Sequence, residues 1–224
     1  MKTFLGIDWG GTYIKAGIVD TKGRIVKKIS YSSDKLKQKR VFVSEIVSLI
    51  KKHRDFKISA IGIGAPGIVD TNKGFIYYLP NIPGWKNYPL GNILKDKLRL
   101  PVFLNNDASV FALAEARLGA ARAKSRAIFL TLGTGLGGAV IIDGHVLNTG
   151  ISALELGHVP ISLTQQQCGC GGRGCIQTFT GNKYLLKRYK ELTKNSVKEV
   201  KDISYKALGG QKEAISVWKE FSFH

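Results

Sequence analysis

The sequence predicts an α/β protein made of two similar lobes that face each other across a cleft. Two observations lead to this prediction. Strand-like alternation and helical periodicity interleave along the chain, which is typical of mixed α/β folds. A pattern of strand, glycine turn, strand, aspartate turn and strand opens the chain and returns at 127–148. We interpret the return as an internal duplication with lobes at 1–119 and 120–224; the alternative is chance similarity of two β-hairpins.

The first lobe begins with three apolar runs separated by turn signals, at 4–8, 13–20 and 24–31. These runs predict a three-stranded antiparallel meander. The segment 58–70 is strand-like with glycine punctuation, and a short strand is expected at 102–107. Periodic apolar residues predict helices at 40–54, 90–100 and 108–119.

The second lobe opens with the repeated meander, whose glycine turn "LGTGLGG" is followed by a "DG" turn. Apolar residues then recur at helical spacing in the basic stretch 183–201 and in the last residues, 209–224. In these segments we expect the lysines to lie on solvated helix faces.

The composition indicates a globular protein, because hydrophobic residues make up 44% of the 224 residues. No apolar run reaches the roughly 18 residues of a membrane helix, and Asp8 interrupts the N-terminus before a signal-peptide core develops. We therefore expect a cytoplasmic protein without a membrane partner. The net charge of +18 would suit a polyanion, but solvated lysine faces explain it better, so no nucleic-acid partner is expected.

All cysteines of the chain, Cys168, Cys170 and Cys175, lie in the stretch "CGCGGRGC". A local cluster with an odd count favours a metal site in a reducing compartment, although pairing of two thiols by oxidation is the alternative. Three thiolates and one imidazole would close a tetrahedral zinc shell. His158, ten residues before the cluster, is the predicted fourth ligand; a merely packed histidine is the alternative. The expected zinc is structural, because four protein ligands leave no open position.

Two glycine turns, "DWGGT" and "LGTGLGG", could bring backbone N–H groups close to an anion. Asp8 ends a strand beside the first turn, where its carboxylate could hold a hydrated Mg²⁺ against nucleotide phosphates, or could simply cap the turn. Asn106 and Asp107 follow an apolar strand and open a helix. They are candidates for hydrogen bonding to hydroxyls and for a general base, but a helix N-cap fits them equally.

Taken together, these motifs resemble those of the ROK family (repressors, open reading frames and sugar kinases) in the actin-like ATPase superfamily. The resemblance covers residues 4 to about 181 and is carried by "GIDWGGTYIKAGIVD", "GIGAPGIVD", "LPNIPGW", "NNDASVFALAEARLGA", "LTLGTGLGGAVIIDG", "ELGH" and "CGCGGRGCIQTFTG". It implies an actin-like (ribonuclease H-like) fold of two meander-led lobes, with ATP and sugar between them, and a homodimer or higher homo-oligomer.

Roles for individual residues follow from the resemblance alone. It makes Asp107 the catalytic base and places zinc on His158, Cys168, Cys170 and Cys175. The hexose would contact Gly67, Asn81, Asn106, Glu155 and His158. The ATP phosphates, with Mg²⁺ near Asp8, would lie on Gly10, Gly11, Thr12, Gly133, Thr134, Gly135 and Gly137. One imidazole nitrogen of His158 would bind the metal while the other faces the sugar.

The chain departs from the family pattern in two ways. After the last cysteine the family usually carries a glutamate that contacts the sugar near its anomeric end, whereas "GCIQ" places Gln177 there. An amide lacks the charge-assisted strength of a carboxylate, so sugar choice or affinity would change. Family members also continue through a glycine-rich adenosine loop and a final helix, and we expect this chain to be a C-terminally shortened form with an incomplete second lobe.

The resemblance implies an ATP-dependent hexokinase of the glucokinase type, with glucose converted to glucose 6-phosphate. Two alternatives stay open: a polyphosphate-dependent glucokinase, whose relatives generally lack the cysteine motif, and a shortened, non-catalytic sugar-binding module. A sugar-sensing regulator is disfavoured, because the family motif begins at residue 4 and leaves no room for a preceding DNA-binding segment.

Overall fold

A computed structural model gives the fold, and it describes residues 2–10, 13–32, 36–80, 82–147, 150–151, 154–163 and 166–224. The chain divides into two compact units. The first contains Met1–Ala127 and Val140–Ala153, and the second contains Ile128–Ala139 and Leu154–His224. The predicted lobe boundary at Gly119 stays a prediction.

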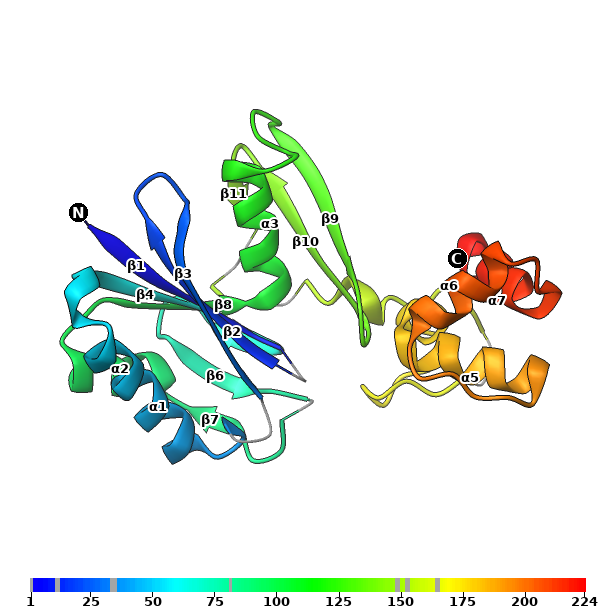
Figure 1. The fold of residues 1–224 in the computed structure, drawn as a ribbon, viewed down its shortest axis with the longest axis horizontal. Coiled ribbons are helices and arrows are strands. Elements are labelled where there is room, and N and C mark those ends of the chain that lie inside the picture. Colours follow the sequence, from blue (N-terminus) through cyan, green and yellow to red (C-terminus); the bar gives the residue numbers. More distant parts are fainter. Residues whose placement is uncertain are drawn as a thin grey trace. The chain divides into compact units, whose positions relative to one another are not determined.

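The first unit contains most of the strands, and Figure 1 shows their arrangement. Its elements are β1 (Thr3–Trp9), β2 (Tyr13–Asp20), β3 (Ile25–Ser32), α1 (Lys39–Lys52), η2 (Arg54–Phe56), β4 (Ile58–Ala65), β5 (Ile68–Asp70), β6 (Phe75–Tyr78), β7 (Lys86–Tyr88), α2 (Leu90–Leu98), β8 (Val102–Asn106) and α3 (Asp107–Leu118). The predicted meander and the three predicted helices are all present, with bounds shifted by one or two residues.

The central sheet has the strand order β3-β2-β1-β4-β8. The meander β1 to β3 pairs antiparallel, whereas β4 pairs parallel with both β1 and β8. Because parallel strands run in the same direction, the carboxyl ends of β1, β4 and β8 meet at one edge of the sheet. In α/β proteins this edge is the usual place for a ligand.

The core of this unit packs one face of the sheet against α1 and α2. In β1 the alternate residues Leu5, Ile7 and Trp9 are buried, as the period of a half-buried strand requires. The Trp9 ring stacks on Phe42 of α1 at 3.9 Å between ring centroids, and Trp85 meets both rings edge-on. These three large buried rings, in mutual contact, anchor α1 to the sheet.

The predicted strand-like segment 58–70 is two strands instead of one. β4 ends at Ala65, and the chain turns at Gly67, whose φ of +152° favours glycine, before β5 begins. β5 then pairs with β6 and β6 with β7 in a separate antiparallel sheet. The turn at Gly67 therefore moves the chain from the first sheet to the second.

The repeated meander forms β9 (Arg126–Leu132), β10 (Leu136–Ile142) and β11 (His145–Val146), in the order β11-β10-β9. This order matches β3-β2-β1 and confirms the duplication that the sequence indicates. Asp143 and Gly144 link β10 to β11 with φ angles of +50° and +76°, which is the type I′ geometry expected of an Asp-Gly hairpin turn.

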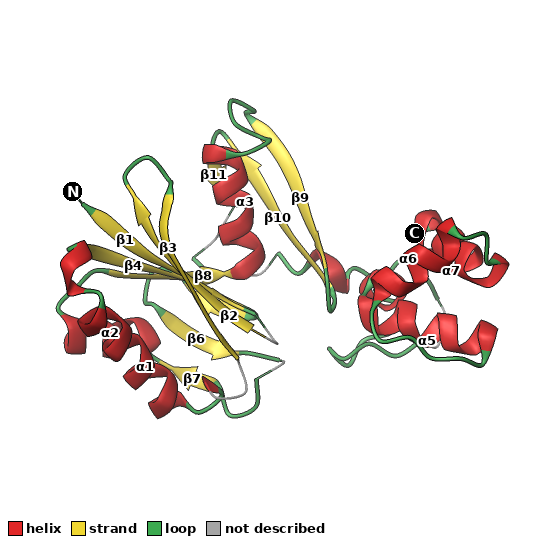
Figure 2. Ribbon diagram, in the orientation of Figure 1, coloured by secondary structure: helices red, strands yellow, loops and turns green. Residues whose placement is uncertain are grey.

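The second unit is mostly helical beyond residue 154 (Figure 2). Its elements there are η3 (Leu156–His158), α4 (Gln177–Thr180), α5 (Asn182–Thr193), α6 (Val200–Leu208) and α7 (Lys212–Phe223). The buried residues Leu185, Tyr189 and Val217 belong to a separate core shared by α5, α6 and α7. The helical pattern predicted over 183–201 is interrupted, because Lys194 adopts a left-handed conformation with φ of +60° and ends α5.

The basic residues of α5 support the interpretation of the charge as solvated helix faces. Lys183, Lys187 and Lys190 are exposed, whereas Leu185 and Tyr189 of the same helix are buried. Arg188 instead crosses to α7, where it makes two hydrogen bonds of 2.7 and 2.9 Å to the Glu220 carboxylate. Among the residues that the structure describes, no helix combines the length and the apolar composition that crossing a membrane requires.

The aromatic cluster gives a first testable prediction. Phe42→Ala removes the ring that contacts both tryptophans and should lower the free energy of unfolding by about 3–5 kcal/mol. Phe103→Ala makes the same change at a side chain that is 65% exposed and should cost less than about 0.5 kcal/mol. Urea titrations followed by circular dichroism would measure both; equal midpoints for the two variants would contradict the packing.

Candidate functional site

The carboxyl edge of the central sheet gathers the polar residues that the sequence predicts for catalysis. Asp8 lies near the end of β1, directly opposite Gly64 of β4 in the parallel register. Gly64 in turn lies opposite Asn105, and Ala65 opposite Asn106, across β4 and β8. Asp8 is therefore two strands away from Asn106, or about 10 Å across the sheet.

Asp107 is the first residue of α3 and follows the last residue of β8. Its carboxylate is partly buried, and Oδ1 accepts a hydrogen bond of 2.8 Å from the Ala108 backbone N–H. Gly64 of β4 lies beside it: a Cβ there would make ordinary van der Waals contact with the Asp107 Cα at 3.4 Å and with the Val110 side chain at 3.5 Å. Gly64 is a residue beside the site that the sequence did not predict, although the glycine-rich stretch "GIGAPG" could have indicated a close backbone approach.

Asn106 is the N-cap of α3, as one of the two interpretations of this segment predicts. Its Oδ1 accepts from the Ser109 backbone N–H at 3.2 Å, and its Nδ2 donates to the Gly67 carbonyl at 3.2 Å. An amide has two acceptor and two donor positions, so one of each remains for a ligand. The capping role and the predicted contact with a hexose hydroxyl are compatible, and the structure brings Gly67, Asn106 and Asp107 together.

The first glycine turn is described only in part. Gly10 donates its backbone N–H to the Tyr13 carbonyl at 3.0 Å, and a Cβ on Gly10 would lie 2.8 Å from the same oxygen. Glycine is therefore required at this position for steric reasons. Gly11 and Thr12, predicted to bind phosphate, and Asn81, predicted to contact the hexose, lie outside the described residues.

The second glycine turn joins β9 to β10 and is tied to the start of α5. Gly133 donates its N–H to the Gly135 carbonyl at 3.0 Å and accepts from the Asn182 N–H at 2.9 Å. Thr134, at the tip, is exposed. A Cβ on Gly181 would lie 3.0 Å from the Thr134 carbonyl oxygen, so the turn and the helix start approach each other closely. Gly137 follows within β10.

The structure brings the four predicted metal ligands together. The ligand atoms of His158, Cys168, Cys170 and Cys175 all lie within 4.8 Å of one another. The Cys170 and Cys175 sulfurs are 3.8 Å apart, and the Cys168 sulfur is 3.4 Å from Nδ1 of His158. Tetrahedral zinc with its usual bond lengths requires about 3.8 Å between two sulfurs and about 3.6 Å between sulfur and nitrogen, so the residues present fit zinc.

Local backbone turns shape this cluster. The Cys168 N–H donates to the Gly172 carbonyl and the Gly171 N–H donates to the Cys168 carbonyl, at 2.9 and 3.1 Å. Gly171 and Gly174 have φ angles of +90° and +67°, which glycine adopts without strain. The three sulfurs can therefore converge within one short stretch, and all three cysteines are free thiols in the structure.

The thiols differ in their tendency to ionise. Burial opposes ionisation of Cys168, but N–H donors that include the Cys170 backbone and the Gln177 side chain outweigh it and lower the pKa to about 7. Burial and the neighbouring thiols raise the pKa of Cys175 to about 12. A metal ion that binds all three sulfurs must therefore displace the proton of Cys175 at neutral pH.

The remaining predicted hexose ligands lie beside the cluster in the second unit. Nε2 of His158 is 3.9 Å from a Glu155 carboxylate oxygen, while Nδ1 faces the Cys168 sulfur. The two nitrogens therefore have the separate surroundings that the proposed dual role of His158 requires. Gln177 turns its amide toward the cluster: Nε2 donates to the Cys168 sulfur at 3.1 Å and is 3.4 Å from Nδ1 of His158.

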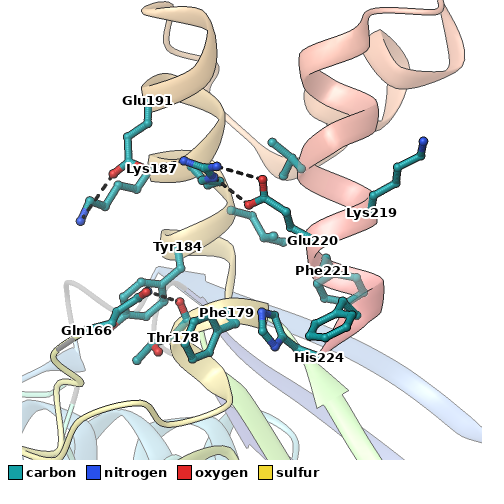
Figure 3. A pocket seen from close by; sticks show the side chains of 14 residues that line it. Gln166, Thr178, Phe179, Tyr184, Lys187, Glu191, Lys219, Glu220, Phe221 and His224 are labelled. Atoms are coloured by element: carbon teal, nitrogen blue, oxygen red, sulfur yellow. Dashed lines mark hydrogen bonds and ion pairs between the residues drawn. The ribbon is translucent and has the colours of Figure 1, made fainter. Parts of the chain in front are cut away.

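A cavity in the second unit does not coincide with the predicted site residues. It has a volume of about 560 Å³ and is bounded by α4, α5 and α7. In Figure 3, His224 points toward Phe179, and their ring centroids are 4.4 Å apart; Gln166 and Tyr184 lie nearby. Gln166 also donates to the Thr178 carbonyl. Within the part of the chain that the structure describes, no residue predicted to bind metal, hexose or phosphate lines this cavity.

Comparison with known proteins identifies relatives over most of the chain. The sequence profile described as "ROK family" matches residues 4–224. A glucokinase of Thermotoga maritima is 36% identical over 194 residues, which cover 84% of this chain and 61% of that protein. A xylose repressor of Caldicellulosiruptor bescii is 33% identical over 204 residues, which cover 88% of this chain and 51% of the repressor.

The solved structures confirm the predicted α/β class and actin-like fold. A ROK family glucokinase from Streptomyces griseus, in complex with glucose and AMPPNP, matches with a TM-score of 0.83 and 29% identity. The match covers 98% of this chain and 75% of that one. Of the two curated relatives, the chain spans about three fifths of the length of the glucokinase and about half of the length of the xylose repressor. These relatives include both an enzyme and a repressor.

The ligand set gives a second prediction. Loss of a group that only supports a metal ligand weakens metal binding by roughly 10–100-fold. His158→Gln removes a predicted ligand itself and should therefore weaken zinc binding by more than this. His145→Gln, at an exposed hairpin residue, should leave zinc affinity unchanged. Competition with a chromophoric chelator would measure both affinities, and metal analysis of the purified chain should find a single zinc ion. Equal affinities of the two variants would remove His158 from the ligand set.

Proposed function

This chain belongs to the ROK family, and from that membership we propose that it transfers the γ-phosphoryl group of ATP to a hydroxyl of a hexose, with glucose as the first candidate. The observation that carries the proposal is the position of Asp107. It lies at the carboxyl edge of the central sheet, two strands from Asp8, where a base and a magnesium-binding carboxylate would serve one reaction.

In the proposed reaction, the Asp107 carboxylate accepts the proton of the attacking hydroxyl. The hydroxyl oxygen forms a bond to the γ-phosphorus while the bond from that phosphorus to the bridging oxygen of ADP breaks. The Ala108 N–H holds one oxygen of the carboxylate at 2.8 Å, which fixes its orientation. Such a base contributes about 10²–10⁴-fold to the rate.

The other predicted residues bind and orient the reactants. Gly67 and Asn106 are hydrogen-bonded to each other and would present the amide to the hexose, with Asn81 in the same pocket. From the second unit, Glu155, His158 and Gln177 would contact further hydroxyls. The backbone of the glycine turns, including Gly10, Gly11, Thr12 and Gly133–Gly137, would hold the phosphates.

Two metal ions belong to the proposal. Zn²⁺ on His158 and the three cysteines would fix the imidazole so that its other nitrogen faces substrate. Mg²⁺ near Asp8 would neutralise charge on the phosphates. We also propose that the chain forms a homo-oligomer, which light scattering would test.

A second candidate is a sugar-binding module without catalysis, and the similarity to a xylose repressor over 88% of this chain favours it. For the enzyme, polyphosphate stays an alternative donor, since the net charge of +18 suits a polyanion. Parallel measurements of hexose phosphorylation with each donor and of hexose binding distinguish both alternatives from the main proposal.

The third prediction tests Asp107. In a coupled assay with a panel of hexoses, Asp107→Asn should lower kcat by about 10²–10⁴-fold and change hexose binding little, because the amide keeps the shape of the side chain but cannot accept a proton. Asp96→Asn, at an exposed position of α2, is the matched control and should retain full activity.

The assay is run with ATP and with polyphosphate, and hexose binding is measured by calorimetry in each case. Turnover that persists in Asp107→Asn would refute the base assignment. Hexose binding by the wild-type chain without turnover on either donor would favour the non-catalytic module.

A further inference from the structure

Gln177 occupies an unusual position between two parts of the second unit. It is the first residue of α4 and follows the last cysteine by two positions. Its side-chain amide has a donor end and an acceptor end, and the two ends face different structures. The donor end faces the cysteine cluster, and the acceptor end faces the β9–β10 glycine turn.

At the donor end, Nε2 lies 3.1 Å from the Cys168 sulfur, a normal distance for an N–H···S hydrogen bond. A thiolate sulfur keeps lone pairs when it binds a metal, so this hydrogen bond is compatible with an occupied site. Groups that donate hydrogen bonds to metal ligands orient those ligands and tune the affinity of the site. The Gln177 amide therefore has the position of such a supporting group.

At the acceptor end, the amide oxygen packs closely against the turn. A Cβ added to Gly135 would lie 2.5 Å from Gln177 Oε1, and one added to Gly157 would lie 3.3 Å from it. The main chain reinforces this approach: the Gly181 N–H donates to the Gln177 carbonyl, and the Asn182 N–H donates to the Gly133 carbonyl, both at 2.9 Å.

We propose that Gln177 is a positioning residue that couples the metal cluster to the glycine turn at 133–137. When zinc orders the cluster, the Cys168 sulfur fixes the donor end of the Gln177 amide. The acceptor end of the amide then packs against Gly135, so zinc binding restricts the motion of the turn. The statement that the same turn receives donor phosphates rests on the proposed function; the coupling itself does not.

The chemistry of the amide explains why glutamine suits this position. A glutamate side chain has the same shape but would place a carboxylate oxygen where the N–H now meets sulfur. Two negative groups at about 3 Å repel each other, and the donated hydrogen bond is lost. In this chain Gln177 therefore contacts the metal cluster, in addition to the sugar contact that the family pattern assigns to the usual glutamate.

The first experiment measures zinc affinity by chelator competition. Gln177→Glu should weaken binding by about 10–100-fold, and Gln177→Ala by about 10-fold. Gln38→Glu, the same change at an exposed residue before α1, is the control and should stay within about twofold of the wild type. Circular dichroism checks that each variant folds. Wild-type affinity in Gln177→Glu would overturn the proposal.

A double-mutant cycle tests whether the coupling passes through Gln177. Gly135 has no positive φ, so alanine fits its backbone and acts only through the added Cβ. Gly135→Ala should weaken zinc binding about 3- to 10-fold in the wild-type chain and leave it unchanged in Gln177→Ala. The same loss in both backgrounds would mean that the turn affects the cluster by another route.

Hydrogen exchange measures the effect in the other direction. At saturating zinc, amides of 133–137 should exchange more slowly than after removal of zinc by a chelator, and this difference should disappear in Gln177→Ala. A zinc effect of equal size in both chains would overturn the coupling. None of these measurements contains sugar or nucleotide, so an absence of kinase activity would refute the proposed function without touching this result.

Discussion

Parallel pairing of β4 with both β1 and β8 is the constraint on which the rest of the first unit depends. It brings the ends of β1 and β8 to one edge, whereas antiparallel pairing at only one of these two junctions would have sent Asp8 and Asn106 to opposite ends of the sheet. The first turn of α3 then packs against β4, where Asp107 and Val110 lie close to Gly64. The shared direction of β1, β4 and β8 therefore determines at which edge of the sheet the candidate base lies.

The two copies of the meander show that burial of their apolar residues depends on the strands and helices that follow each copy in the sequence. In β1, Leu5 and Ile7 are 0% and 3% exposed, because β4 pairs beside them and α1 packs over them. In β9, Ile128 and Leu130 are 73% and 55% exposed, and within the described ranges the sheet ends at this strand. A three-stranded meander alone does not bury its apolar residues; the neighbouring strand and helix do.

Much of the fold and of the metal cluster could be predicted from sequence, because the signals are local. Strand alternation, helical periodicity and cysteine spacing are read within a few residues, and the structure brings the predicted fourth ligand, His158, close to the three cysteines. The short strands β5 to β7 carry too few residues to show a period. Gln177 is singled out by its place after the cysteine motif, but the contacts of its amide with Cys168 and Gly135 depend on how the chain folds and are not visible in the sequence.

The metal cluster is also notable for how little chain it needs. Its hydrogen-bonded members, from His158 to Gln177, lie within 19 positions of one another, and closing so short a loop costs little conformational entropy. During synthesis this segment emerges from the ribosome before α5 to α7 emerge. Zinc could therefore be captured by the growing chain, and the later helices would be added to a segment that is already ordered.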